Sequence, residues 1–139
     1  MATIADSITI DQAAGILAAG QARAAAIGIA ANVAVLDTGT HLKVFARMDG
    51  AVLGSIDVAL GKARTAVLFG ISSEAVWDYC QPGAPAHNLE ASNGGLMPFA
   101  GSLPLVTRDG TLIGAVGVSG GAPAQDLDIA QAAVAALTV

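Results

Sequence analysis

The sequence has 139 residues, of which 54% are hydrophobic and 12% are charged, and its formal net charge is −5 at pH 7. The length is that of one common domain, so we expect a single domain over residues 1–139. The acidic balance argues against nucleic acid or an anionic membrane surface as a partner, because both attract basic patches. A single cysteine excludes an internal disulfide and a cysteine-based zinc cluster.

The low share of charged residues also predicts how the protein assembles. Mean hydropathy is +0.65, yet no apolar run approaches the roughly 20 residues that a membrane-spanning helix needs. No basic segment followed by an apolar core opens the chain, so the predicted compartment is the cytoplasm. Because a chain with few charges has little polar surface to cover itself, we expect a homo-oligomer that buries part of its alanine-rich surface.

A helix and a hairpin are predicted first. Thr9 and Gln12 have the spacing of a capping box, which indicates a helix that starts at residue 9 or 10 and ends near residue 27. The runs 31–37 and 41–48 are rich in β-branched or alternating residues and flank a polar turn. These two runs therefore predict an antiparallel hairpin.

Two further helices are predicted next. Ser55 is a suitable N-cap for a helix that extends to about Phe69, where Gly70 ends it. A short helix over residues 73–80 can follow, with Ser72 or Ser73 as its cap. The longer of these two helices carries an apolar stripe that predicts its core-facing side.

The second half of the chain adds a loop, two strands and a helix. Residues 81–102 form the longest irregular segment, and a loop of this length in a small domain is usually functional or mobile. Strands are predicted over 103–107 and 111–118, with the second one buried on both faces, and a helix over 124–137. The order α-β-β-α-α-β-β-α favours an α+β fold in which helices flank an antiparallel sheet.

A glycine-rich corner joins the last strand to the last helix. Its glycines, at 114, 117, 120 and 121, do not have the Gly-x-Gly-x-x-Gly spacing of a dinucleotide site, and no βαβ unit can form around them. One interpretation is that the glycines only allow tight packing. The other is that the backbone N–H groups of Ser119, Gly120 and Gly121 bind an anionic ligand.

Asp126 lies in the first turn of that last helix, in line with its inward face. Its carboxylate can satisfy the free N–H groups at the helix start. Alternatively, it can orient a ligand or act in catalysis. Both interpretations stay open from the sequence alone.

Two cationic side chains are the other candidates. Arg47, followed by Asp49 at the end of the second strand run, could pair with a nearby carboxylate or grip an anionic ligand bidentately. Lys62 shares a largely uncharged helix face with Ser55, Thr65 and Phe69. It is either a solvated lysine or a half-buried one whose lowered pKa suits a general base.

The remaining reactive side chains predict no metal site. His41 lies on a strand face and is expected to be exposed. His87 and Glu90 have metal-ligand spacing, but two residues alone are a weak signal. Cys80 is expected to be a small apolar filler. Trp77, Tyr79 and Phe99 could line an apolar wall, although core packing is the default interpretation.

Several motifs in this order resemble the GlcG/HbpS family, which also occurs as the C-terminal domain of PduO-type proteins. The resemblance covers nearly the whole chain. One departure is that the family usually has Gly-Gly-x-Pro where this chain has Gly101-Ser102-Leu103-Pro104. The matching stretches are Val35-Leu36-Asp37-Thr38-Gly39, Arg47-Met48-Asp49-Gly50-Ala51, Lys62-Ala63-Arg64-Thr65-Ala66, and residues 113–121 with Gln125-Asp126.

The resemblance implies a profilin-like sandwich with helices on both sides of an antiparallel sheet, and symmetric oligomers. Some relatives bind haem, which makes haem a candidate cofactor here. Others are encoded with enzymes that handle small hydroxy acids or diols. The family has no agreed reaction, and the histidines of this chain lie outside the matching motifs.

Two functions follow as hypotheses. The first is a small-molecule-binding protein, in which Arg47, Asp49 and the amides of residues 119–121 hold an anionic organic acid or a tetrapyrrole such as haem. The second is a cofactor-independent isomerase, lyase or hydrolase acting on a small oxygenated compound. In that enzyme, Lys62 or Asp126 would be the base and Arg47 the electrostatic clamp.

Overall fold

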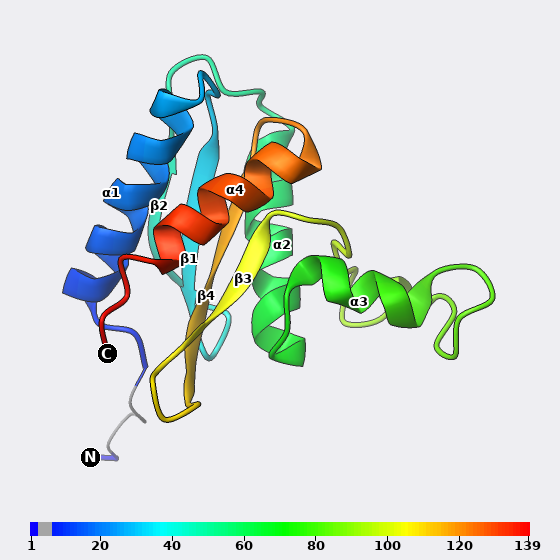
Figure 1. Ribbon diagram of the computed structural model, residues 1–139. Helices are drawn as coiled ribbons and strands as arrows, with labels where there is room; N and C mark the ends of the chain where they lie inside the picture. Colours follow the sequence, from blue (N-terminus) through cyan, green and yellow to red (C-terminus); the bar gives the residue numbers. More distant parts are fainter. Residues whose placement is uncertain (3–6) are drawn as a thin grey trace.

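The computed structural model describes residues 1–2 and 7–139, and it contains one antiparallel sheet with the strand order β2-β1-β4-β3 (Figure 1). The strands are β1 (Asn32–Asp37), β2 (Leu42–Arg47), β3 (Ser102–Val106) and β4 (Leu112–Ser119). The helices are α1 (Ile10–Ala26), α2 (Ser55–Phe69), α3 (Ser73–Cys80), the short 3-10 helix η1 (Leu89–Ala91) and α4 (Pro123–Val134). The predicted fold class and order of elements are confirmed.

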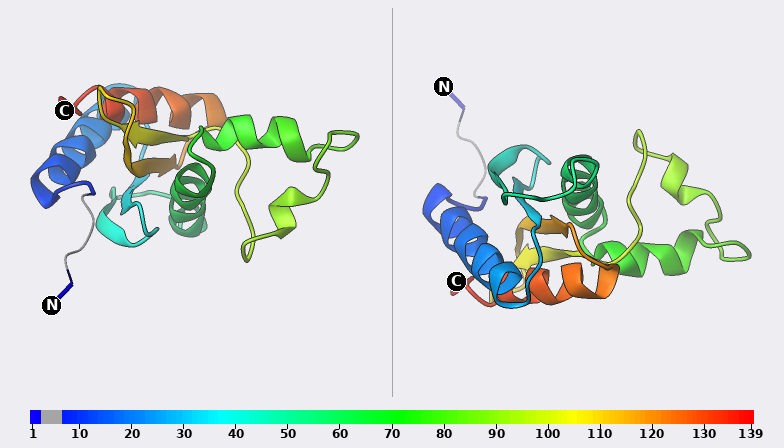
Figure 2. Two further views of the ribbon diagram at one scale, coloured as in Figure 1. Left: turned by 90° about the horizontal axis from the view of Figure 1, so that it is seen from below. Right: turned by 90° about the horizontal axis from the view of Figure 1, so that it is seen from above.

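The sheet separates two layers of helices. Helices α1 and α4 lie on one face and α2 lies on the other (Figure 2). Strand side chains alternate between the two faces. The larger apolar ones point to α1 and α4, where the buried core contains Ile16, Val33, Val116, Val118 and Ile129. Full burial of each such side chain contributes roughly 1.5–3 kcal/mol, so this layer supplies most of the apolar stabilisation.

Small residues dominate the layer under α2. Leu36, Ala63, Ala66 and Ala115 form its buried cluster. At Gly117, in the middle of β4, an added Cβ would collide with the backbone carbonyl of Ala59 in α2. Glycine is therefore required for the close approach of this helix to the central strand.

Two of the three predicted N-caps are confirmed. Thr9 Oγ1 accepts a hydrogen bond from the Gln12 amide at 3.1 Å, and the predicted capping box is complete. Ser72 caps α3, as predicted. The prediction of Ser55 as an N-cap was wrong, because Gly54 holds that position. The Ser55 hydroxyl instead binds the buried amide of Asn32 at 2.7 Å.

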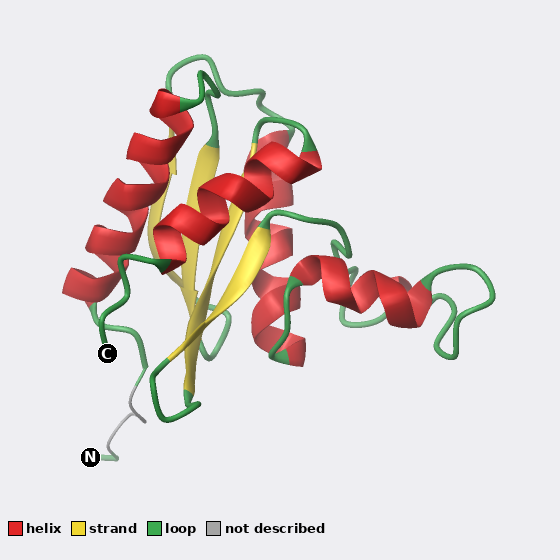
Figure 3. Cartoon of the chain, viewed as in Figure 1, coloured by secondary structure: helices red, strands yellow, loops and turns green. Residues whose placement is uncertain are grey.

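Helix α3 and the loop after it project from the body of the molecule (Figure 3); we call residues 73–101 the α3 arm. Hydrogen bonds fix the end of the arm to α2 and to the start of α3. The Met97 amide donates to Thr65 Oγ1 at 2.9 Å, and Ser73 Oγ donates to the Phe99 carbonyl at 2.7 Å. The arm then enters β3 at Ser102, one residue earlier than predicted.

The sheet has two edges, formed by β2 and β3. Strand β3 carries Pro104, which is paired in register with Ala115 of β4. Proline has no backbone N–H, so it is found in edge strands and not in central ones. Among the described helices, none is long and apolar enough to cross a membrane.

Candidate functional site

Lys62 and Asp126 form a buried ion pair at the junction of α2, α4 and β4. Lys62 Nζ lies 2.9 Å from Asp126 Oδ2 and donates a second hydrogen bond to the Val118 carbonyl at 3.0 Å. The two side chains are only 1% and 2% exposed. The interpretation of Lys62 as a solvated lysine is therefore wrong. The helical periodicity that turned Asp126 inward is confirmed by its burial.

The second oxygen of Asp126 faces the glycine-rich corner. Oδ1 accepts a hydrogen bond from the Gly121 amide at 2.8 Å. One N–H of the predicted anion site is thus directed to a carboxylate of the protein itself. Ser119 belongs to β4, where it is paired with Asn32 and buried. The Gly121 amide and the Lys62 ammonium thus bind different oxygens of the Asp126 carboxylate.

The environment of Lys62 favours the neutral amine more than water does. Burial lowers the pKa of Lys62, and this effect outweighs the hydrogen bond and charge of Asp126, which raise it. The ring of Phe99 covers the ammonium, with 5.0 Å between Nζ and the ring centroid. Lys62 is therefore a desolvated amine with one carboxylate, one carbonyl and one aromatic face around it.

Gly101 shapes the space around the amine. Its φ is +132°, and an added Cβ would lie 2.6 Å from Lys62 Nζ and 2.6 Å from the Val118 carbonyl oxygen. Only glycine combines this backbone conformation with this close approach. The next residue, Ser102, is buried, and its hydroxyl has no hydrogen-bond partner.

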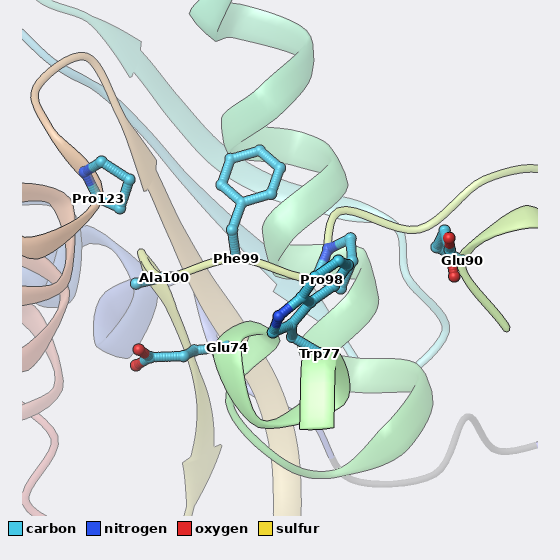
Figure 4. Close-up of a pocket in the computed structure, with 7 residues that line it drawn as sticks. All are labelled: Glu74, Trp77, Glu90, Pro98, Phe99, Ala100 and Pro123. Carbon is cyan, nitrogen blue, oxygen red and sulfur yellow. The ribbon is translucent and has the colours of Figure 1, made fainter. Parts of the chain in front are cut away.

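A pocket of about 530 Å³ lies beside the pair, between α3, the end of the α3 arm and the start of α4 (Figure 4). Its walls are mostly apolar, and Phe99 belongs both to these walls and to the surroundings of Lys62. The lining residues are Glu74, Trp77, Glu90, Pro98, Phe99, Ala100 and Pro123. We call this space the Phe99 pocket. The expected apolar wall thus contains Trp77 and Phe99, whereas Tyr79 lines a smaller groove with Phe69.

Arg47 and Asp49 lie elsewhere. Arg47 ends β2 at one edge of the sheet and is paired with Asn32 of β1, whereas the Phe99 pocket adjoins the arm that leads into β3 at the other edge. Both residues are exposed, and neither lines the pocket. The structure therefore unites two of the three predicted catalytic residues, Lys62 and Asp126, and keeps Arg47 apart from them.

The exposure predicted for His41 and the burial predicted for Cys80 are confirmed. His41 and His87 are exposed, and Cys80 is a buried free thiol whose pKa is raised, first by burial and then by Glu90. Within residues 1–2 and 7–139, no group of three or more His, Cys, Asp and Glu side chains is arranged to hold a metal ion.

The sequence predicted Phe99 only as a possible wall residue, without its contact to Lys62, and did not indicate Gly101 as part of the site. Both lie in the irregular segment, where periodicity gives no orientation. The only signal was the departure from Gly-Gly-x-Pro at residues 101–104, which pointed to this place in the chain without showing what it touches.

Comparison with known proteins gives consistent matches. The model of a family described as haem degrading protein HbpS-like matches residues 8–135. The corrinoid adenosyltransferase PduO of Salmonella typhimurium is 40% identical over 118 residues, which are 84% of this chain and 35% of PduO. This chain thus spans about a third of the length of that relative.

Solved structures agree with this match. The crystal structure of protein ORFY from Klebsiella pneumoniae superposes with a TM-score of 0.91 at 32% identity, over 97% of this chain and 93% of ORFY. The crystal structure of a PduOC–haem complex superposes with a TM-score of 0.88 at 35% identity, over 94% and 95% of the two chains. The predicted GlcG/HbpS resemblance is confirmed, and this chain belongs to the HbpS-like family.

Proposed function

We propose that this protein binds a flat, largely apolar small molecule of the tetrapyrrole class, such as haem, in the Phe99 pocket. The observation that carries the proposal is the pocket itself, about 530 Å³ in volume, with Trp77, Phe99 and two prolines in its walls. Aromatic faces stack well on planar rings, and a mostly apolar cavity of this size is typical of ligand sites. The haem in the PduOC complex supports haem as the ligand.

The lining residues are compatible with haem. Trp77 and Phe99 would flank the ring, and the two glutamates are the only lining residues with metal-ligating atoms. Glu90 Oε2 is buried and has no hydrogen-bond partner, so it is available as an oxygen ligand for the iron. When bound, haem would supply redox chemistry and an iron site whose properties depend on that ligand.

The charge of the pocket favours a tetrapyrrole over a small organic acid. Two carboxylates and no Lys or Arg side chain line it. A small acid enclosed there would meet like charges, whereas a large ring can direct its acidic groups to the open side. Arg47 and Asp49 stay predicted contacts for an anionic group at the β2 edge.

A haem titration tests the proposal, because Trp77 is the only tryptophan of the chain and lines the pocket. Its fluorescence should be quenched in parallel with the growth of the bound-haem absorbance band. Phe99→Ala should raise the Kd about tenfold, the effect of losing one aromatic contact of roughly 1.4 kcal/mol.

Phe69→Ala is the matched control. Phe69 is 36% exposed and Phe99 is 39% exposed, but Phe69 lies outside the pocket. Phe69→Ala and Arg47→Ala should both leave the Kd unchanged. A Kd that rises in Phe69→Ala and not in Phe99→Ala would place the ligand elsewhere and contradict the proposal.

The Lys62–Asp126 pair favours a second candidate function, cofactor-independent catalysis. Burying an ion pair contributes little net stability compared with apolar side chains of the same volume. A fully buried pair beside a ligand pocket therefore points to chemistry as well as packing. Lys62 and Asp126 are the acid–base groups that such an isomerase, lyase or hydrolase would use.

A further inference from the structure

The side chain of Phe99 lies between the Lys62 amine and the Phe99 pocket. The Phe99 ring lines the pocket and also covers Nζ, with the ring centroid 5.0 Å away. Nζ has hydrogen-bond acceptors on its other sides, in Asp126 and the Val118 carbonyl. Phe99 is 39% exposed, and its backbone carbonyl is fixed by the hydrogen bond from Ser73 Oγ. Rotation of this ring would therefore open the amine to a molecule in the pocket.

The surroundings of Lys62 prepare the amine for nucleophilic attack. An amine attacks only in its neutral form, and burial favours that form by lowering the pKa of Lys62. Asp126 Oδ2, at 2.9 Å from Nζ, can accept the proton that the amine loses. Its other oxygen is fixed by the Gly121 amide, so the acceptor keeps its orientation.

We propose that Lys62 forms an iminium, a Schiff base, with an aldehyde or ketone bound in the Phe99 pocket. The inference rests on the proposed function insofar as it needs this pocket to be a ligand site. The carbonyl compound should be flat and apolar and should lack a negative charge, because aromatic residues and two glutamates line the pocket. The amine would be a catalytic residue, and Asp126 its proton acceptor and donor.

The step balances without an outside oxidant or reductant. The Lys62 ammonium gives a proton to Asp126, and the neutral amine forms a C–N bond to the carbonyl carbon. A second amine proton moves to the carbonyl oxygen, which becomes a hydroxyl group. Asp126 then returns its proton to that hydroxyl, water leaves, and the C=N bond carries the positive charge. Such an iminium withdraws electrons from the neighbouring carbon, which suits an isomerase or a lyase.

Borohydride trapping tests this with little ambiguity, because Lys43 is the only other lysine in the chain. Lys43 is exposed on β2 at the other edge of the sheet, so it is a built-in control. The intact protein is equilibrated briefly with cinnamaldehyde near pH 7 and treated with sodium borohydride. Intact mass and peptide mapping then measure the reduced adduct at Lys62, at Lys43 and at the N-terminal amine.

The expected result is a saturable adduct at Lys62 that exceeds the Lys43 adduct, because burial lowers the pKa of Lys62 and the pocket brings the aldehyde beside its amine. Phe99→Ala should speed labelling of Lys62 and leave that of Lys43 unchanged. An adduct confined to Lys43 and the N-terminus, in the wild type and in Phe99→Ala alike, would overturn the proposal. The wild-type result needs no substitution, so misfolding of a variant cannot imitate it.

Repeating the labelling in the presence of haem distinguishes this inference from the proposed function. If haem quenches Trp77 fluorescence but Lys62 is never labelled, the Schiff base is wrong and ligand binding stands. If Lys62 is labelled and haem neither binds nor competes, the carbonyl site stands and the tetrapyrrole is wrong. Labelling that haem suppresses in proportion to its binding supports both.

Discussion

Asp126 shows how much of the site depends on single residues. It accepts hydrogen bonds from Lys62 and from the Gly121 amide, and these contacts join α2, β4 and α4 in one buried cluster. A buried charge that loses its partner is far more costly than the intact pair is stabilising. Removal of either charged partner is therefore expected to destabilise the whole cluster.

Asp126→Asn should lower the free energy of unfolding by about 3–5 kcal/mol, because the Lys62 ammonium stays buried without its counter-ion. Urea unfolding followed by circular dichroism measures the change. The control is Asp128→Asn in the same helix, since the Asp128 side chain is 41% exposed and pairs with Arg23 at the surface. Equal losses of unfolding free energy in the two variants would contradict the prediction that the buried carboxylate matters more than the exposed one.

The loss in Asp126→Asn should also depend on pH. In the folded protein the pKa of Lys62 lies below its ordinary value, so between those two values the unfolded chain binds more protons than the folded one. The free energy of unfolding contributed by Lys62 therefore rises with pH across that window. Without Asp126, burial acts on Lys62 unopposed, and the rise should begin at a lower pH than in the wild type.

At the scale of elements, the junction of the α3 arm with β3 is the least replaceable connection. The Gly101 carbonyl accepts a hydrogen bond from the Val118 amide at 2.8 Å, which extends the pairing of β3 with β4 toward the ion pair. Backbone conformation and lack of space both require glycine at this position. The arm therefore positions Phe99 through a fixed backbone and not through a loose loop.

Gly101→Ala should destabilise the protein by roughly 2–4 kcal/mol, from backbone strain together with overpacking against Lys62. The matched control is Gly15→Ala, on the exposed side of α1, where an added Cβ meets nothing within 4 Å. That variant should gain up to about 1 kcal/mol, because alanine favours the helix. Thermal unfolding of both variants measures the contrast, and a neutral Gly101→Ala would refute the argument.

The elements were predictable where local signals set them. The capping box at Thr9, the polar turn of the hairpin and the Ser72 cap act within a few residues, and these elements agree with the structure to within one or two residues at most ends. Ser55 failed because its hydroxyl binds Asn32, which lies 23 residues away in the chain. A long-range partner overrode a local propensity.

The site was predictable only in part for the same reason. Helical periodicity indicated that Asp126 points inward and that Lys62 lies on an uncharged helix face. Which carboxylate meets which cation depends on the packing of residues 64 positions apart. Arg47 and Lys62 were both predicted from the sequence as cationic site residues. The strand order, which local patterns do not reveal, places Arg47 at the opposite edge of the sheet. Phe99, in an irregular segment, offered no periodicity at all.

At the scale of the whole molecule, the α3 arm presents exposed aromatic side chains. Trp77 and Tyr79 are 41% and 54% exposed on α3, and Phe69 lies nearby at the end of α2. Exposed apolar clusters of this kind usually mark contact surfaces. Together with the 12% share of charged residues, this supports the expectation of a homo-oligomer.

Light scattering should therefore give a mass that is a multiple of 13.6 kDa, and Tyr79→Lys should shift it toward the single chain by placing a charge in the contact. Leu42→Lys is the control, because Leu42 is 55% exposed but lies on β2, away from the arm. A wild-type protein with the mass of one chain, or an assembly that only Leu42→Lys dissolves, would show that the arm is not the contact.

Pro104 in β3 has a consequence for how the chain behaves when it is crowded or partly unfolded. A free sheet edge can recruit strands from other molecules and seed fibrous aggregation. Proline removes a donor from the β3 edge, and the α3 arm lies beside that edge (Figure 1). Lengthening of the sheet is thus blocked on one side, and any strand-by-strand aggregation of the folded protein must begin at β2.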